Sequence, residues 1–149
     1  MLKVEKPSEF FAFRIAESVR ELKQAIPPYS ELYLASLLGD FVTKSIPDAV
    51  FFDFVNAIQA TSSIKIKYFK DLGDRSLMIA GVWPGSLRRK PVKIDYYVSM
   101  GQMGYGNLAS IFRTKIRDEH FADLFADLEA HFDLYRIIVG KALGSGWTP

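Results

Sequence analysis

The chain has 149 residues, of which 49% are hydrophobic and 24% are charged, a balance that excludes a disordered chain and a fibrous repeat. The absence of cysteine excludes disulfides and thiolate metal sites, and a net charge of +2 is too small to predict binding to nucleic acid. The first ten residues lack the apolar run of a signal peptide, and the longest uncharged stretch, residues 96–112, is too rich in glycine and polar residues to span a bilayer. We therefore expect one cytoplasmic domain over residues 1–149, with no integral membrane segment and no cofactor.

Two helices are expected in the first third of the chain. Hydrophobic residues recur every three to four positions over residues 8–26, which predicts a helix with Ser8 as its N-cap. Pro27 and the proline after it should end this helix. Ser30 is then the expected N-cap of a second helix, which carries its apolar face to about residue 42.

The middle of the chain predicts two more helices. Residues 50–58 have helical spacing and an unusual number of aromatic side chains, so we expect a third helix there. A fourth helix is expected from residue 64 to Trp83, where Pro84 and the following glycine stop it. The alternating pattern of residues 64–68 is equally compatible with a short strand, and this alternative stays open.

The last part of the chain predicts a fifth and a sixth helix. The fifth follows Pro91 and has an almost fully apolar surface around Gly101, which predicts a central place in the fold. The sixth runs from Asp118 to Leu143, and residues 144–149 form a short C-terminal tail. With strands nearly absent and loops short, the sequence predicts an all-α, single-domain bundle of five or six helices.

Charged and aromatic side chains are most concentrated between residues 71 and 97. Four cations lie within six positions at the turn before the fifth helix, Arg88 to Lys93, and an arginine pair can hold a phosphate or a carboxylate with parallel hydrogen bonds. A solvated loop that balances nearby acids would have the same composition. Asp74 lies away from the apolar stripe of its helix, so we expect it to meet water or a basic neighbour such as Arg88. The candidate ligand-binding or anion-binding residues are Asp74, Arg88, Arg89, Asp95, Tyr96 and Tyr97.

Two other patterns have ordinary structural explanations. The glycines of GQMGYG, residues 101–106, lack the spacing of a phosphate-binding loop and lie in a helical pattern, so we expect them to let a neighbouring helix approach closely. A stripe of acids at four-residue spacing is typical of an exposed helix face, and the Glu-x-x-His pairs of a di-iron bundle are absent. We therefore predict no metal site and assign no catalytic residue. The stripe consists of Glu119, Asp123, Asp127 and His131.

A pattern of glycine, serine, proline and tyrosine residues runs through residues 72–109. It reads GD-x-SL-x3-G-x2-P-x-SL-x-R from Gly73 to Arg89, and YY-x2-MG-x3-Y-x2-LA from Tyr96 to Ala109. This pattern resembles a family of uncharacterised bacterial proteins, whose members tend to have two phenylalanines where this chain has residues 82 and 83. The resemblance implies a cytosolic helical domain with no assigned reaction, and it adds no catalytic residue.

The sequence thus favours a binding or interaction module over an enzyme, with the turn from Arg88 to Lys93 as its binding surface. A peripheral membrane protein that uses this turn together with Trp83 is one alternative. The other is an enzyme or small-anion-binding protein that uses Arg88, Arg89, Asp95 and Tyr96.

The aromatic content predicts self-association. The chain has 12 Phe, 7 Tyr and 2 Trp, more large apolar side chains than one small core is expected to enclose. Symmetric dimers are the commonest oligomers, so we expect a homodimer or another protein partner. The expected surface is the third helix, because Phe51, Phe52 and Phe54 cannot all lie on one helical face.

Overall fold

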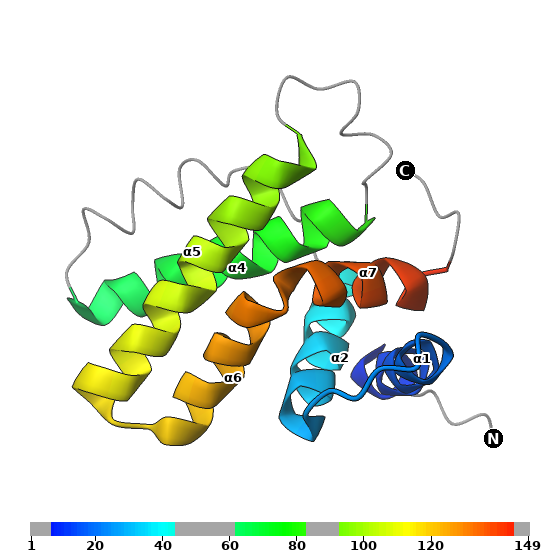
Figure 1. Ribbon diagram of the computed structural model, residues 1–149, viewed down its shortest axis with the longest axis horizontal. Coiled ribbons are helices and arrows are strands. Elements are labelled where there is room, and N and C mark those ends of the chain that lie inside the picture. The colour runs from blue at the N-terminus through cyan, green and yellow to red at the C-terminus, as the bar shows by residue number, and fades with distance from the viewer. Residues whose placement is uncertain (1–6, 44–61, 83–92, 145–149) are drawn as a thin grey trace.

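The computed structural model describes residues 7–43, 62–82 and 93–144, and these residues form six α-helices and no strand (Figure 1). The predicted all-α, single-domain bundle is confirmed. The strand alternative for residues 64–68 is wrong, because these residues belong to a helix. The third predicted helix, residues 50–58, and the tail after residue 144 lie outside the described residues. The elements are α1 (Pro7–Glu21), α2 (Pro28–Thr43), α4 (Ser62–Val82), α5 (Ile94–Ile111), the π-helical turn η2 (Phe112–Ile116), α6 (Glu119–Ala130) and α7 (Phe132–Ala142).

The helices pack mainly in pairs. α1 lies against α2, α5 crosses α4 and runs beside α6, and α7 contacts both α4 and α1 (Figure 1). Every residue from Ser76 to Val82 is buried, and apart from Ser76 this last third of α4 is apolar around its circumference. α5 keeps an exposed stripe that includes Met103 and Asn107. α5 packs on α4, α6 and α7, as the expected central place of the fifth helix predicts, and the most completely buried segment is the end of α4.

Glycines allow α4 and α5 to cross closely, as the sequence predicts. A Cβ atom at Gly104 would lie 2.7 Å from the carbonyl oxygen of Phe69 and 2.7 Å from the amide nitrogen of Gly73. Gly101 lies against the ring of Phe132 in α7, and the face of α5 that carries Gly101 and Tyr105 is buried. These glycines therefore serve helix packing and do not form a phosphate-binding loop.

α1 ends at Glu21, five residues before the predicted boundary at residue 26. Lys23 adopts a left-handed φ of 55°, and its amide donates to the carbonyl oxygen of Arg20 at 3.1 Å. The Gln24 amide donates to the carbonyl oxygen of Val19, also at 3.1 Å. These two bonds form a Schellman motif in which a lysine takes the position that glycine usually occupies, and the motif ends the helix before the prolines are reached.

Neither serine that was predicted as an N-cap occupies the N-cap position of its helix. Ser8 lies inside α1, and Ser30 lies inside the first turn of α2, which begins at Pro28. The amides of Ser30 and Glu31 donate to the carbonyl oxygen of Pro27, so α2 starts at the prolines. A proline suits the first helical position because it fixes φ and lacks an amide hydrogen.

The helix predicted from Asp118 to Leu143 is two helices. The backbone of His131 leaves helical geometry, with φ −118° and ψ 31°, and α6 and α7 run in different directions on its two sides (Figure 1). No proline or glycine marks the break. α6 packs on α5, whereas α7 packs on α4 and α1, so tertiary contacts account for it.

Among the described helices, none combines the length and the apolar character needed to cross a membrane.

Candidate functional site

A carboxylate held between three helices, Asp74 of α4, is bound by two tyrosines and a lysine. Tyr33 of α2 and Tyr105 of α5 both donate to Oδ1, at 2.6 and 2.8 Å. Lys70 Nζ lies 2.8 Å from Oδ2 and 5.6 Å from the centre of the Tyr33 ring. The Asp74 side chain is only 11% exposed, and of the two expected neighbours, water or a basic side chain, the structure shows a basic side chain. Its basic neighbour is Lys70, one helical turn earlier in α4. The tyrosines of α2 and α5 cover the other side of the carboxylate.

The groups around Asp74 keep their protons at neutral pH. Burial raises the pKa of Tyr105 and of Tyr33 well above the usual value of 10, and the negative charge of Asp74 raises both further. Burial alone would lower the pKa of Lys70, but the charge and the hydrogen bond of Asp74 outweigh it, and the pKa is raised. None of the three groups can therefore act as a base or a nucleophile at neutral pH.

The cavity beside Asp74 is too small for an organic substrate. Its volume is about 30 Å³, which is room for one or two water molecules. Both oxygens of Asp74 already accept hydrogen bonds from protein groups. The arrangement can hold three helices together. The cavity is lined by Tyr33, Ser36, Leu37, Asp40, Lys70 and Asp74.

A second carboxylate, Asp127 of α6, has a similar set of partners. Ser30 of α2 donates its hydroxyl to Oδ2 at 2.6 Å, and Tyr135 of α7 donates to the same oxygen. His131 Nδ1 lies 3.0 Å from Oδ1. Burial and the hydrogen bond to Asp127 raise the pKa of Tyr135 above its usual value. Ser30 therefore ties α2 to α6 instead of capping α2.

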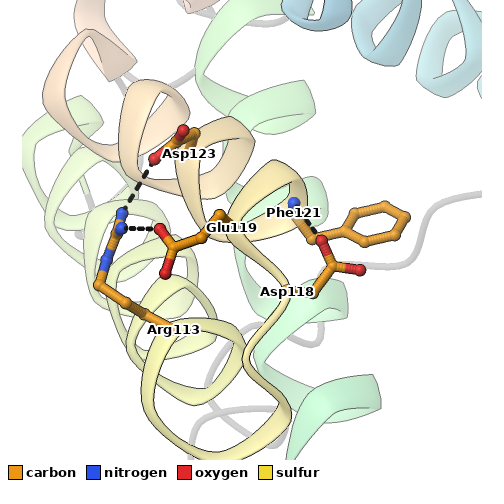
Figure 2. A network of polar contacts seen from close by, with 5 residues as sticks. All are labelled: Arg113, Asp118, Glu119, Phe121 and Asp123. Carbon is orange, nitrogen blue, oxygen red and sulfur yellow. Dashed lines mark hydrogen bonds and ion pairs between the residues drawn. The ribbon is translucent and has the colours of Figure 1, made fainter.

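The acidic stripe of the sixth predicted helix is divided between two structures. Glu119 and Asp123 both bind Arg113 of η2, at 2.6 and 3.2 Å (Figure 2). Asp118 caps α6 by accepting from the amide of Phe121 at 3.1 Å, on the side of the turn away from Arg113 (Figure 2). The other half of the stripe forms the Asp127 cluster. Within the described ranges, no group of three or more His, Asp or Glu side chains is placed to hold a metal ion.

The residues predicted to form a site do not converge in the part of the chain that the structure describes. Asp95 is exposed in the first turn of α5, Tyr96 is half-buried and Tyr97 is buried, with the two tyrosine rings edge to face at 5.2 Å. Tyr97 is eight residues, about 12 Å along the helix axis, from Tyr105, the α5 tyrosine that reaches Asp74. Asp74 therefore belongs to a different cluster. The structure does not describe the arginines at positions 88 and 89, which lie in the undescribed range 83–92.

The outer face of α1 is a feature that the sequence analysis missed. Phe13 is 65% exposed and Phe10 is 47% exposed, while the opposite face of the helix is buried against α2 and α7. The signal was present, because three phenylalanines at positions 10, 11 and 13 cannot share one helical face. Among them only Phe11 enters the core.

Comparison with known proteins identifies no relative. No family model, curated protein or solved structure matches the chain. The functional argument therefore depends on the residues and contacts described above.

Proposed function

We propose that this protein is a cytoplasmic helical interaction module that binds a protein partner through the outer face of α1. The observation that carries the proposal is the exposure of Phe10 and Phe13, 47% and 65%, on a helix whose other side is already packed. Exposed aromatic side chains that lie together are typical of protein interfaces, where they contribute most of the binding energy.

The face is held rigidly, which favours binding. Arg14 Nε donates to the carbonyl oxygen of Ala142 at 2.9 Å, and Glu21 pairs with Lys141 at 2.9 Å, so the middle and the C-terminal end of α1 are tied to α7. A partner would meet side chains on a backbone that is already ordered. Such preorganisation lowers the entropy lost on binding.

The polar clusters support a role other than catalysis. Asp74 and Asp127 use their oxygens to hold helices, and the cavity beside Asp74 accommodates only water. The alternatives that depend on Arg88 and Arg89, an anion site or a membrane surface, concern residues outside the described ranges. The outer face of α1 is the surface that the described contacts favour.

Site-specific photo-crosslinking in the cells that naturally make the protein tests this function. A benzoylphenylalanine at position 13 should form covalent adducts with a protein partner. The same residue at position 116, where Ile116 of η2 is 47% exposed, is the matched control and should form none, because η2 packs on α5 and α6 whereas α1 packs on α2 and α7. The absence of adducts at position 13, or the same adducts at both positions, would contradict the proposal.

A further inference from the structure

Four exposed residues form a single stripe along α1. They lie at spacings of four, three and four residues, and at 100° per residue they fall within about 60° of the helix circumference. All four are exposed. The order along the stripe is an acid, a large ring, a small side chain and a base. The residues are Glu9, Phe13, Ala16 and Arg20.

This stripe is complementary to itself when it is read in the opposite direction. A second α1 that runs antiparallel places its Arg20 against Glu9 and its Ala16 against Phe13. The spacing of four, three and four is the same from either end, so a two-fold axis midway along the stripe repeats both contacts. Each copy would supply a ring and the small residue that leaves room for the other copy's ring.

The two charges at the ends of the stripe are available for such a contact. Arg14 and Glu21 of the same helix are bound to α7. Glu9 and Arg20 form no ion pair with any other described residue. A parallel arrangement would bring Glu9 against Glu9 and Arg20 against Arg20, and like charges across an interface oppose association.

From this pattern we infer that the partner of α1 is a second copy of this chain, docked antiparallel through Glu9, Phe13, Ala16 and Arg20. The inference rests on the proposed function and names the partner of the same face. The stripe is only about 16 Å long, so the dimer should be weak and dependent on concentration. Phe10 lies beside the stripe and extends its apolar area.

Charge reversal gives a sharp test. The dissociation constant of the purified full chain would be measured by sedimentation equilibrium at low salt, with circular dichroism to show that each variant is folded. Glu9→Arg and Arg20→Glu should each weaken the dimer by about tenfold or more. The double variant should restore wild-type affinity to within about threefold, and an equimolar mixture of the two single variants should form heterodimers.

A control substitution separates this effect from a change in net charge. Lys67→Glu alters the net charge as much as Arg20→Glu, but at an exposed position on α4, and it should leave the dissociation constant unchanged. A wild-type chain that is monomeric at every concentration would overturn the inference, as would single variants that dimerise normally or a double variant that does not recover.

The two proposals can fail separately. If position 13 forms an adduct with a different protein while the purified chain stays monomeric, the inference that the partner is a second copy is wrong, and the proposal of an interaction module is supported. If position 13 forms no adduct at all, both proposals fail. An adduct of twice the chain's 16.9 kDa, together with recovery in the double variant, supports both.

Discussion

The two buried carboxylates, Asp74 and Asp127, hold the same helix in nearly the same way. Each accepts a hydroxyl from α2, Tyr33 in one case and Ser30 in the other. Each also accepts a second hydroxyl, from a tyrosine on another helix, and each pairs with a basic side chain four residues away in sequence. Since residues 30 and 33 lie on one face of α2, that face is bound to α6 by one hydroxyl and to α4 by the other.

The surroundings of the two clusters differ. The ring of Tyr105 is fully buried and lies 6.0 Å from the rings of both Phe125 and Phe132, and its bond to Asp74 is buried. At Asp127 the basic partner, His131, is 59% exposed, and the bonds from Ser30 and from the tyrosine are only partly buried. Two clusters with equal numbers of hydrogen bonds should therefore contribute unequally, because only the Asp74 cluster contains a hydrogen bond that is fully buried.

Removing each carboxylate should show the largest difference. Asp74→Ala leaves a fully buried phenol and a lysine unpaired, and should lower the free energy of unfolding by about 3–4 kcal/mol. Asp127→Ala should cost about 1–2 kcal/mol, since none of the hydrogen bonds that it removes is fully buried. Urea denaturation of the two variants measures both values. Equal midpoints would show that the aromatic surroundings of Asp74 do not matter.

High pH should weaken both clusters through their tyrosines. The pKa values of Tyr33, Tyr105 and Tyr135 are raised in the fold, so their neutral forms stabilise it. This stabilisation is fully present below pH 10, the ordinary pKa of tyrosine, and is lost as the pH rises above 10. At one pH unit above 10 the loss is about 1.4 kcal/mol for each phenol.

Absorbance at 295 nm during an alkaline titration checks this expectation. These three phenols should ionise only together with the loss of helical circular dichroism. Their ionisation in a chain that is still folded would contradict the burial that raises their pKa values.

Removing a single tyrosine hydroxyl should cost less stability than removing a carboxylate, and the loss should again be larger at the Asp74 cluster than at the Asp127 cluster. Tyr105→Phe removes one donor from Asp74 without removing the ring, and should cost about 1–2 kcal/mol. Tyr135→Phe should cost about 0.5–1 kcal/mol, because its hydrogen bond to Asp127 is only partly buried. Thermal unfolding at pH 7 compares them, and a larger loss for Tyr135→Phe would reverse the proposed ranking.

The basic side chains should contribute least. Lys70 and His131 are 47% and 59% exposed, and ion pairs screened by solvent contribute little. Lys70→Gln should cost about 1 kcal/mol and His131→Gln about half a kcal/mol or less. Urea midpoints at pH 7 provide the measurement. A loss of several kcal/mol in either variant would mean that the ion pair, and not the phenols, holds α2.

Part of the Asp74 cluster could be read from the sequence. Lys70 and Asp74 have the four-residue spacing of a helical ion pair, so a basic neighbour within α4 was predictable. Tyr33 and Tyr105 lie 41 and 31 residues away, and no local pattern joins them to Asp74. The same applies to Asp127. Its four-residue spacing from the neighbouring acids is typical of an exposed helix face, and only the packing of α2 brings Ser30 to it.

Apolar spacing, a property of neighbouring residues, was enough to predict that the described segments are helices and which faces of α1 and α5 enter the core. Tertiary packing was needed to bury the last two turns of α4 completely, to bend the chain at His131 and to bring two aspartates to α2. These features depend on contacts between helices that are distant in the chain, and the burial of an acid costs free energy unless those distant donors arrive. The exposed stripe on α1 lies between these cases, because its residues are visible in the sequence but its exposure depends on where α2 and α7 pack.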